Sequence, residues 1–572
     1  MKPDPILESE LSLPDYAPNL ATMLNTNVAR FQDHTIYQEV HHNRFQPLSW
    51  TQFQKDVAAI QGYFQEVGFQ EGDRVAILSR NRQEMLEIEL AVMAMGGVSV
   101  PIFAGYPPNR AAALVDFCDP RFVVVADEEQ FAKVPHPTTY QRIIHFDPLE
   151  NTAPNVVSFS QILHHEPLGE FITGSEIAPD AVTLMMYTSG TMGKPKLVQL
   201  THGNILSQQA AMKVLWKLSA KDRFLSYLPW HHSFGGIFEK YAALVNGAVL
   251  SLEHGFGKDI DLLLDNWKQV RPTVFFSVPR IYQEITTRVL QDPDLEKVIF
   301  HDELRFIFTA AAPLPKSISD MFEARNIPVY EGWGLTETSP CCTVTDPRLP
   351  RQSGMVGKPI PGVTIALNED GEILVKGPNV MKGYFRNPEA TEAVLAPDGW
   401  FATGDVGSIT ANGLCLISRK DRIFKLSNAE KVIPTEIENL IVKDCTYLSH
   451  AFVAGSGRDY PVTLLFPNKT MFSKVTDESR LKAGCKCPRH MEEFARCLKN
   501  CLGEINHAID EKYARLKAAM LIDYELSIEN EELTPSMKLA PNVVGRVFKA
   551  NIENLYGTEE PLPDPVYIIH LE

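Results

Sequence analysis

Residues 187–196, YTSGTMGKPK, concentrate hydroxyl side chains, glycines and lysines directly after an apolar run. Glycines allow backbone N–H groups to approach phosphate oxygens, hydroxyls donate further hydrogen bonds, and lysines offset negative charge. The segment therefore predicts a loop that wraps a polyphosphate, with an exposed polar turn as the alternative. The predicted contact residues are Thr188, Ser189, Gly190, Thr191, Gly193, Lys194 and Lys196. The loop is not a Walker A motif, because its glycines lack the four-residue spacing that precedes Gly-Lys-Ser/Thr.

Three further segments carry side chains suited to metal, sugar or anion chemistry. Residues 331–337, EGWGLTE, combine carboxylates with a hydroxyl, and a hard cation such as Mg²⁺ prefers oxygen ligands of this kind. Asp405 ends the segment 400–405, where an ionised carboxylate can accept hydrogen bonds from sugar hydroxyls. Lys538 lies near the C-terminus, and one ammonium group can hold two anions together. Each segment alone has a structural alternative: a packed tryptophan, a turn-capping aspartate or a solvated surface lysine.

Taken together, these segments resemble the signatures of the adenylate-forming superfamily, which includes acyl-CoA synthetases, aryl-CoA ligases, firefly luciferase and the adenylation domains of peptide synthetases. They occur in the family's order and span most of the chain. The resemblance implies a ligase that uses ATP and Mg²⁺ to convert a carboxylic acid into an acyl-adenylate. The acyl group then passes to a thiol.

The resemblance also implies which residues hold the nucleotide. Relatives place an aromatic side chain along the adenine, here Trp333, and a threonine at the α-phosphate, here Thr336. Glu337 and Thr188 are the implied Mg²⁺ ligands, and Asp405 matches the aspartate that binds the ribose. The remaining implied ATP contacts are Ala311, Gly332 and Arg419.

Two residues are implied to act on the acid. His232 aligns with a family histidine near the incoming carboxylate, and the adjacent His231 leaves this choice open by one position. A histidine that is only structurally satisfied is the alternative. Lys538 matches the lysine that bridges carboxylate and α-phosphate during adenylation. Asp421 matches the hinge about which the C-terminal domain of relatives rotates to withdraw that lysine. The implied catalytic residues are Lys538, His232, Thr336 and Glu337.

Two departures from the family pattern concern the thiol acceptor. Ala429 stands where relatives usually have a glycine that lets the thiol arm pass. Residues 539–541 lack the basic pair common in long-chain enzymes. CoA is therefore the first choice of acceptor, and the phosphopantetheine of an acyl carrier protein is the alternative.

The acid is predicted from two segments. Residues 277–282 and 524–535 look most like long-chain acyl-CoA synthetases, which implies a medium- or long-chain fatty acid and a role in lipid metabolism. An aryl or other hydrophobic acid is the alternative, because a sequence does not measure a tunnel. Gly235 and Gly236 depart from the long-chain pattern, and we expect them to add slack near the tunnel entrance. An inactive nucleotide-binding relative is disfavoured because the chain keeps the whole charged set of Lys196, Glu337, Asp405 and Lys538.

Composition excludes some other classes of protein. A net charge of −17 and a pI near 5.5 argue against a nucleic-acid binder. The acidic start lacks signal-peptide features, and the apolar stretch 90–103 is too short to span a bilayer. We expect a cytoplasmic monomer or homodimer, with peripheral membrane contact as an option for a lipid substrate. Nine cysteines without regular spacing favour plain thiols, and a zinc site is the alternative for Cys485, Cys487, Cys497 and Cys501.

The elements that must position these residues follow an α/β pattern. Apolar runs at 74–78, 98–101 and 122–126 alternate with helix-like stretches such as 84–95. The same alternation continues to about residue 309, and the runs are too continuous for a sheet with one wet face. After about residue 350, closely spaced turns and alternating side chains predict short antiparallel strands.

The predicted fold class is therefore α/β with two domains. Residues 1–418 form a large N-terminal adenylation domain of α/β sheet subdomains plus a small β-barrel-like subdomain. Residues 419–572 form a mobile α+β C-terminal domain. In this domain, Thr435 and Glu438 have capping-box spacing, and helices are predicted around 491–502 and 505–516.

Overall fold

The computed structural model describes residues 6–571, apart from 151–152, 165–175, 189–195, 311–313, 353, 444, 446, 470–487, 528, 535–537 and 559. The chain divides into two compact units. The first comprises Met1–Asn368, Ile373–Thr403 and Ile409–Cys415. The second comprises Glu369–Glu372, Gly404–Ser408 and Leu416–Glu572. The predicted domain boundary after residue 418, and the mobility of the second domain, stay predictions.

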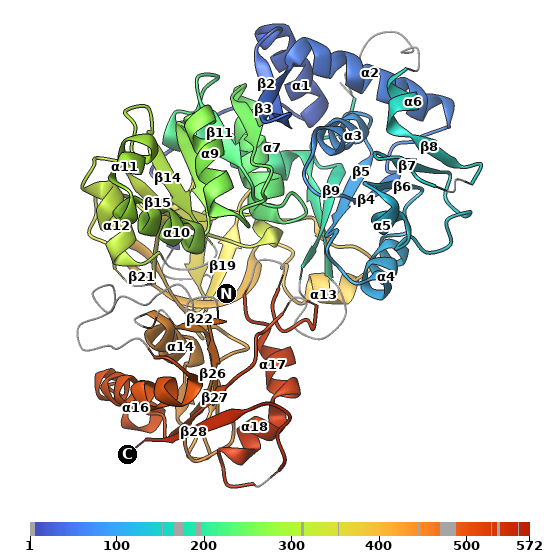
Figure 1. The fold of residues 1–572 in the computed structure, drawn as a ribbon. Helices are drawn as coiled ribbons and strands as arrows, with labels where there is room; N and C mark the ends of the chain where they lie inside the picture. Colours follow the sequence, from blue (N-terminus) through green and yellow to red (C-terminus); the bar gives the residue numbers. More distant parts are fainter. Residues whose placement is uncertain are drawn as a thin grey trace. The chain divides into compact units, whose positions relative to one another are not determined.

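One sheet of the first unit has eight strands in the order β20-β10-β9-β5-β4-β6-β7-β8 (Figure 1). Their bounds are β4 (Arg74–Leu78), β5 (Val98–Ile102), β6 (Phe122–Val125), β7 (Arg142–His145), β8 (Val156–Ser158), β9 (Val182–Thr188), β10 (Lys196–Thr201) and β20 (Gly383–Tyr384). Strands β9, β5, β4, β6, β7 and β8 pair in parallel, and β10 pairs antiparallel to β9. Every residue of β5 and β6 is buried, as expected for a parallel sheet covered on both faces.

A second sheet has fourteen strands in the order β1-β18-β19-β21-β22-β17-β16-β15-β14-β13-β11-β12-β2-β3. Their bounds are β1 (Ile6–Glu8), β2 (Thr35–His41), β3 (Arg44–Ser49), β11 (Arg223–Ser226), β12 (Val249–Leu252), β13 (Val274–Ser277), β14 (Phe306–Thr309), β15 (Val329–Trp333), β16 (Thr343–Val344), β17 (Met355–Pro359), β18 (Thr364–Leu367), β19 (Glu372–Lys376), β21 (Phe401–Thr410) and β22 (Gly413–Arg419). Strands β12, β11, β13, β14 and β15 are parallel. Their carboxyl ends therefore lie at one edge of the sheet, where ligands of α/β proteins bind.

The predicted small β subdomain is the antiparallel part of this second sheet. Strand β18 pairs antiparallel with β1 and β19, and β17 pairs antiparallel with β22. These pairings confirm the short antiparallel strands predicted after residue 350. Closure of the subdomain into a barrel stays a prediction.

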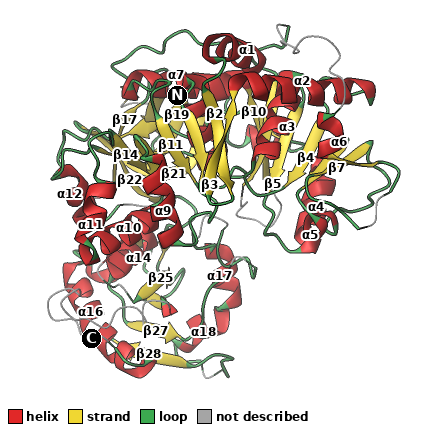
Figure 2. Cartoon of the chain, turned by 45° about the horizontal axis from the view of Figure 1, so that its top comes forward, coloured by secondary structure: helices red, strands yellow, loops and turns green. Residues whose placement is uncertain are grey.

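Helices cover the sheets of the first unit (Figure 2). They include α1 (Leu20–Phe31), α2 (Trp50–Glu66), α3 (Gln83–Ala94), α4 (Pro108–Cys118), α7 (His202–Trp216), α8 (Lys240–Asn246), α9 (Ile260–Val270), α10 (Pro279–Gln291), α11 (Pro293–Ile299) and α12 (Lys316–Glu323). A π-helix, η1 (Phe234–Glu239), leads directly into α8. The α/β pattern predicted from the apolar runs is confirmed.

An aromatic cluster packs helix α7 against the second sheet. The indole of Trp216, 3% exposed, has ring centroids of Phe306 and Phe308 at 5.1 and 5.2 Å. Phe276 and Phe238 lie at 5.5 and 5.8 Å. Aromatic pairs at such distances contribute about 0.5–1.5 kcal/mol each beyond the area that they bury. The cluster therefore fixes η1, which carries Phe238, against strands β13 and β14.

The second unit is an α+β domain around a four-stranded sheet in the order β25-β26-β27-β28. Its elements are α14 (Pro434–Lys443), β25 (Leu448–Ala454), β26 (Val462–Pro467), α16 (Met491–Ala508), β27 (Ala518–Ile522), α17 (Pro541–Val547), α18 (Lys549–Asn554) and β28 (Val566–His570). Alternate residues of β26 enter different cores: Leu465 packs with Leu498 and Leu502 of α16, whereas Leu464 packs with Phe548. This period of two is that of a strand buried on both faces.

Two local predictions for this unit are wrong. The helix predicted over 505–516 ends at Ala508, because Asn506 bonds the backbone of Leu516 at 2.7 and 2.9 Å and folds the chain back. The capping box of α14 does not form, since the Thr435 hydroxyl donates to Ser418 Oγ at 2.9 Å. Its partner Glu438 instead forms an ion pair with Arg422.

No helix within the described ranges combines the length and the hydropathy needed to cross a bilayer.

Candidate active site

The loops that follow β11 and β15 meet at the carboxyl edge of the parallel strands. In the first loop, the His232 N–H donates to Pro229 O at 3.1 Å, and His232 Nδ1 accepts from the Phe234 N–H at 3.3 Å. In the second loop, the Thr336 hydroxyl donates to Ser233 Oγ at 3.2 Å. The fold therefore brings the predicted Thr336 next to the loop that carries the predicted His232.

Glu337 and Lys196 are joined through a tyrosine. The Tyr384 hydroxyl donates to Glu337 Oε1 at 2.9 Å. Lys196 Nζ lies 4.7 Å from the centroid of the Tyr384 ring, within the range of a cation–π contact. The Glu337 carbonyl accepts from the Met381 N–H at 2.8 Å. A carboxylate, a phenol and an ammonium group thus form one polar wall from three separate segments.

Thr188 and Lys196 mark the two ends of the predicted phosphate loop. They are the last residue of β9 and the first of β10, and they are direct partners in the antiparallel register. The chain between them must therefore start and finish at the same edge of the sheet. The predicted contacts Ser189, Gly190, Thr191, Gly193 and Lys194 lie outside the described residues, as does Ala311.

Trp333 is the last residue of β15, and its side chain is only 8% exposed. Its carbonyl accepts from the Cys342 N–H at 2.8 Å, which ties it to the start of β16. The next residue, Gly334, has no room for a side chain, because a Cβ there would lie 1.7 Å from Pro340 O. The position of the indole at the end of β15 therefore depends on a close backbone approach.

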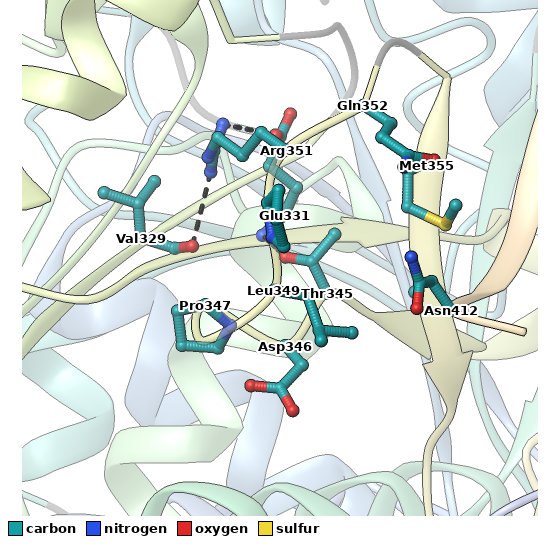
Figure 3. A pocket seen from close by; sticks show the side chains of 12 residues that line it. Val329, Glu331, Thr345, Asp346, Pro347, Leu349, Arg351, Gln352, Met355 and Asn412 are labelled. Carbon is teal, nitrogen blue, oxygen red and sulfur yellow. Dashed lines mark hydrogen bonds and ion pairs between the residues drawn. The ribbon is translucent and has the colours of Figure 1, made fainter.

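Glu331, in the same strand, is held at the wall of a small cavity of about 20 Å³ (Figure 3). Arg351 Nη1 donates to Glu331 Oε1 at 2.5 Å, and Arg351 Nη2 donates to Val329 O at 3.3 Å. Glu331 Oε2 accepts from the Leu314 N–H at 3.1 Å. Burial raises the pKa of Glu331, and Arg351 acts in the opposite direction. This carboxylate links β15 to the loop that follows β14.

The two neighbouring histidines have different surroundings. The ring of His231 packs 4.6 Å from Phe103, and its buried Nε2 has no hydrogen-bond partner among the described residues. Desolvation lowers the pKa of His231 to about 3, and His232 adds to that effect. His231 is therefore neutral at physiological pH. Because His232 sits next to Ser233 and its contact with Thr336, it remains our candidate for the carboxylate site.

Gly235 and Gly236 do not add slack, contrary to the expectation from the sequence. A Cβ on Gly236 would lie 1.9 Å from Trp230 O, and one on Gly235 would lie 2.6 Å from Leu228 O. Both glycines lie in η1, where they allow the π-helix to pack directly against the backbone of the histidine loop. Such π-helical turns are frequent at functional sites.

The second unit carries the remaining predicted residues. Arg419 Nη1 donates to Asp405 Oδ1 at 3.1 Å, and Arg419 Nε lies 3.7 Å from the carboxylate of Asp421. The Gly404 N–H and the Lys420 ammonium both donate to Glu372, at 3.1 and 2.9 Å. The predicted ribose contact, the predicted hinge and Arg419 therefore form one charged group.

Lys538 lies in the same unit, in a loop closed by a bridge between Leu533 and Leu539. Its N–H donates to Thr534 Oγ1 at 3.1 Å, and its carbonyl accepts from the Thr534 N–H at 2.8 Å. The side chain reaches solvent, although the protein around it desolvates the ammonium. Desolvation lowers the pKa of Lys538, Asp405 raises it, and Arg419 lowers it. Lys538 thus experiences the charges of two other predicted site residues.

Comparison with known proteins identifies the family. A family model described as AMP-binding enzyme matches residues 24–385, more than half of the chain. The chain belongs to the AMP-binding enzyme family. A second model, the C-terminal domain of AMP-binding enzymes, matches residues 421–560.

Relatives of this AMP-binding enzyme include long chain acyl-CoA synthetase 7, peroxisomal, of Arabidopsis thaliana, which is 28% identical over 87% of this chain and 80% of its own length. Long-chain-fatty-acid–CoA ligase 5 of Rattus norvegicus is 28% identical over 85% of this chain and 80% of its own length. Among solved structures, ATP-bound MatB from Rhodopseudomonas palustris has a TM-score of 0.73 at 22% identity, covering 93% of this chain and 99% of MatB. AMP-bound O-succinylbenzoate coenzyme A synthetase from Bacillus subtilis has a TM-score of 0.72 at 21% identity, covering 92% and 98%. These structures confirm the fold class.

Sequence reasoning missed two residues of this AMP-binding enzyme that contact predicted site segments. Tyr384 bonds Glu337 from 47 positions away, and Arg351 bonds Glu331 from 20 positions away. Neither residue belongs to a local pattern that spacing could reveal, because each contact depends on how strands pair across the sheet.

The alternative of a zinc site concerns four cysteines of the second unit. Cys497 and Cys501 lie on α16, whereas Cys485 and Cys487 fall outside the described residues. Within the described part, no group of three or more His, Cys, Asp or Glu side chains could hold a metal ion.

Proposed function

We propose that this member of the AMP-binding enzyme family is an AMP-forming acid–thiol ligase. It joins a carboxylate to ATP, releases pyrophosphate and then transfers the acyl group to CoA. The observation that carries the proposal is the polar wall of Glu337, Tyr384 and Lys196. Thr336, next to Glu337, bonds Ser233 of the histidine loop. This wall lies at the carboxyl edge of parallel strands, and its members Glu337 and Lys196 are residues that the sequence alone associates with a nucleotide.

The residues of the wall suit ATP and Mg²⁺. Glu337 offers a carboxylate oriented by Tyr384, and Thr188 and Thr336 offer hydroxyl oxygens, which are the ligands that a hard cation prefers. A magnesium ion bound there would neutralise phosphate charge and polarise the α-phosphorus. Lys196 holds positive charge at the end of the phosphate loop. This charge is local, since the whole chain has a net charge of −17.

The second unit supplies the other charges. Asp405 accepts hydrogen bonds from the ribose hydroxyls, and the bond from Arg419 supports this role by orienting the carboxylate. Lys538 bridges the carboxylate of the acid and the α-phosphate, so that two anions approach each other without full repulsion. Rotation about Asp421 withdraws Lys538 after adenylation and admits the thiol.

The acid is a medium- or long-chain fatty acid. Support comes from the relatives named as long-chain acyl-CoA synthetases or ligases, at 28% identity. The similar solved structures also include an anthranilate CoA ligase in complex with anthranoyl-AMP. An aryl acid is therefore the second candidate.

One experiment tests these assignments together. Purified protein is incubated with ATP, Mg²⁺ and single acids from octanoate to stearate, together with benzoate and phenylacetate. Pyrophosphate release and acyl-AMP are measured with and without CoA. We expect fatty acids to give pyrophosphate, and CoA to consume the acyl-AMP. Acyl-AMP that persists until a carrier protein is added would favour the alternative acceptor, and absence of acyl-AMP with every acid would overturn the proposal.

A further inference from the structure

A single buried side chain from outside the predicted motifs holds the turn that precedes His231 and His232. Asn81 follows strand β4 in the eight-stranded sheet and is 5% exposed. Its Oδ1 accepts from the Trp230 N–H at 2.9 Å, and its Nδ2 donates to Leu228 O at 2.8 Å. The two bonds span 149 and 147 positions of sequence. Asn81 therefore clamps both ends of the turn 228–230 from the neighbouring sheet.

The turn has little freedom to find other partners. Pro229, in the middle, has no N–H to donate, and its carbonyl already accepts from the His232 N–H at 3.1 Å. Without Asn81, the Trp230 N–H and the Leu228 carbonyl would lose these partners inside the protein. A buried polar group left unsatisfied destabilises the folded chain. The turn would therefore shift to reach water or other groups, and His232 would shift with it.

The side chain of Trp230 is fixed by a second contact. Its indole is fully buried, and Lys240 Nζ lies 5.2 Å from its ring centroid. Lys240 forms a buried ion pair with Glu89 of helix α3. The backbone of the turn is thus held by Asn81, and the indole at its end is held by Lys240, which is itself paired with Glu89. Removing Asn81 alone would free the backbone and leave the indole anchored.

The consequence for the site follows along the chain. The turn leads directly to His232 and Ser233, and Ser233 Oγ receives the Thr336 hydroxyl at 3.2 Å. A displacement of the turn therefore changes the distance between the histidine loop and the loop after β15. Displacements near 1 Å can cost a reaction about a hundredfold in rate.

We propose that Asn81 is a positioning residue for adenylation, which keeps His232 and Ser233 aligned with Thr336. The proposal rests on the proposed function, because it concerns the rate of that reaction. It predicts that loss of Asn81 lowers turnover more than it lowers binding of ATP, since the hydrogen bonds of Asn81 among the described residues go to Leu228 and Trp230 and not to Thr188 or Lys196.

The test compares Asn81→Ala with a matched control, Asn506→Ala. Asn506 is also buried, 7% exposed, and also bonds one backbone N–H and one backbone carbonyl, at 2.9 and 2.7 Å. Both variants should lower the melting temperature by similar amounts. We expect Asn81→Ala to lower kcat for acid-dependent pyrophosphate release by about tenfold or more, with KM for ATP changed less than about twofold. Asn506→Ala should keep kcat within about twofold.

Two further variants separate positioning from general damage. Asn81→Ser keeps a hydroxyl that can donate or accept and introduces no charge, so its kcat should lie between those of wild type and Asn81→Ala. In a double-mutant cycle, adding Asn81→Ala to His232→Ala should cost little more than His232→Ala alone, because both act through one loop.

Two results would overturn the proposal: equal kcat in Asn81→Ala and Asn506→Ala, or additive losses in the cycle with His232→Ala. If Asn81→Ala does not fold, the cycle is run with Asn81→Ser, and the same criteria hold. A wild-type protein that releases no pyrophosphate with any acid refutes the proposed function instead.

Discussion

The two units of this enzyme present their predicted site residues in different ways. In the first unit, Thr336 and Glu337 are each hydrogen-bonded by another side chain, and those partners belong to distant segments. In the second unit, Lys538 is fixed through its backbone to Thr534, while its ammonium group is influenced by desolvation first and then by the charges of Asp405 and Arg419. The first unit therefore holds a set of oxygen atoms that other side chains orient. The second unit presents a cation on a loop, which suits a group that acts in one step and is withdrawn in the next.

The largest expected effect is that of Lys538→Ala. If Lys538 bridges the two anions, its loss should lower acid-dependent exchange of pyrophosphate into ATP by about a hundredfold or more. Because the side chain reaches solvent, the melting temperature should change little. Lys512→Ala, which removes another exposed lysine of the same unit, is the control and should leave exchange unchanged. Normal pyrophosphate exchange in Lys538→Ala would show that Lys538 does not bridge the two anions.

Tyr384→Phe tests the set of oriented oxygen atoms in the first unit. The variant removes one hydroxyl, so the Glu337 carboxylate loses the donor that orients it. We expect turnover to fall by about tenfold, roughly 1.4 kcal/mol, and half-maximal activity to need more Mg²⁺. Activity is measured as pyrophosphate release over a magnesium series. The control is Tyr556→Phe, which removes a hydroxyl bonded to Tyr460 O at 2.7 Å in the second unit. An unchanged magnesium dependence in Tyr384→Phe would argue against Glu337 as a ligand.

Acid should destabilise the first unit through two buried histidines. Desolvation lowers the pKa of His231 to about 3 and that of His202 to about 4, from 6.5. Since the unfolded chain binds these protons more readily, the stabilisation is complete above pH 6.5 and is lost as the pH falls from 6.5 towards 4. The slope should reach about 1.4 kcal/mol per pH unit for each histidine. Urea unfolding followed by circular dichroism measures it, and His231→Phe should reduce the slope. An identical slope in that variant would contradict a neutral, buried His231.

Ala429→Gly should have the smallest effect, in the loop of the second unit. Ala429 has a φ of +66°, in the left-handed region that costs a residue with a Cβ about 1–2 kcal/mol. Glycine removes this cost, but it also makes the unfolded chain more flexible, which offsets part of the stabilisation. We therefore expect the free energy of unfolding to rise by up to about 1 kcal/mol, measured by denaturant unfolding. Ala495→Gly, inside helix α16, should instead lower it.

The sequence predicts much of the fold, because local patterns decide it. The run 74–78 is β4 with the same bounds, and the helix predicted over 84–95 is α3, Gln83–Ala94. Both segments are almost wholly buried, so their hydrophobic residues alone predict where the elements lie. The helix predicted over 505–516 fails because the side chain of Asn506 outweighs helical propensity by bonding Leu516.

The candidate site is only partly predictable. Thr336, Glu337 and Lys196 belong to short segments whose residue types suggest phosphate chemistry. Their contacts with Ser233 and Tyr384 depend on which strands lie next to each other. The spacing of residues along the chain does not encode this strand order.

The same holds for Gly236, for which the prediction of added slack is wrong. In the folded chain, Trp230 O lies so close to Gly236 that a Cβ on this residue would be 1.9 Å from it. Gly236 is needed for this close approach. A glycine in a sequence indicates freedom of the backbone, whereas the need for a close approach appears only once the neighbouring segment is in place.

The packing of Trp216 among phenylalanines has a practical consequence for spectroscopy. All six tryptophans, at positions 50, 216, 230, 267, 333 and 400, belong to the first unit. Intrinsic indole fluorescence therefore reports on that unit alone, and the apolar rings around Trp216 should shift its emission to the blue. The second unit contributes no indole fluorescence. A single tryptophan engineered into it would therefore report on the unfolding of that unit.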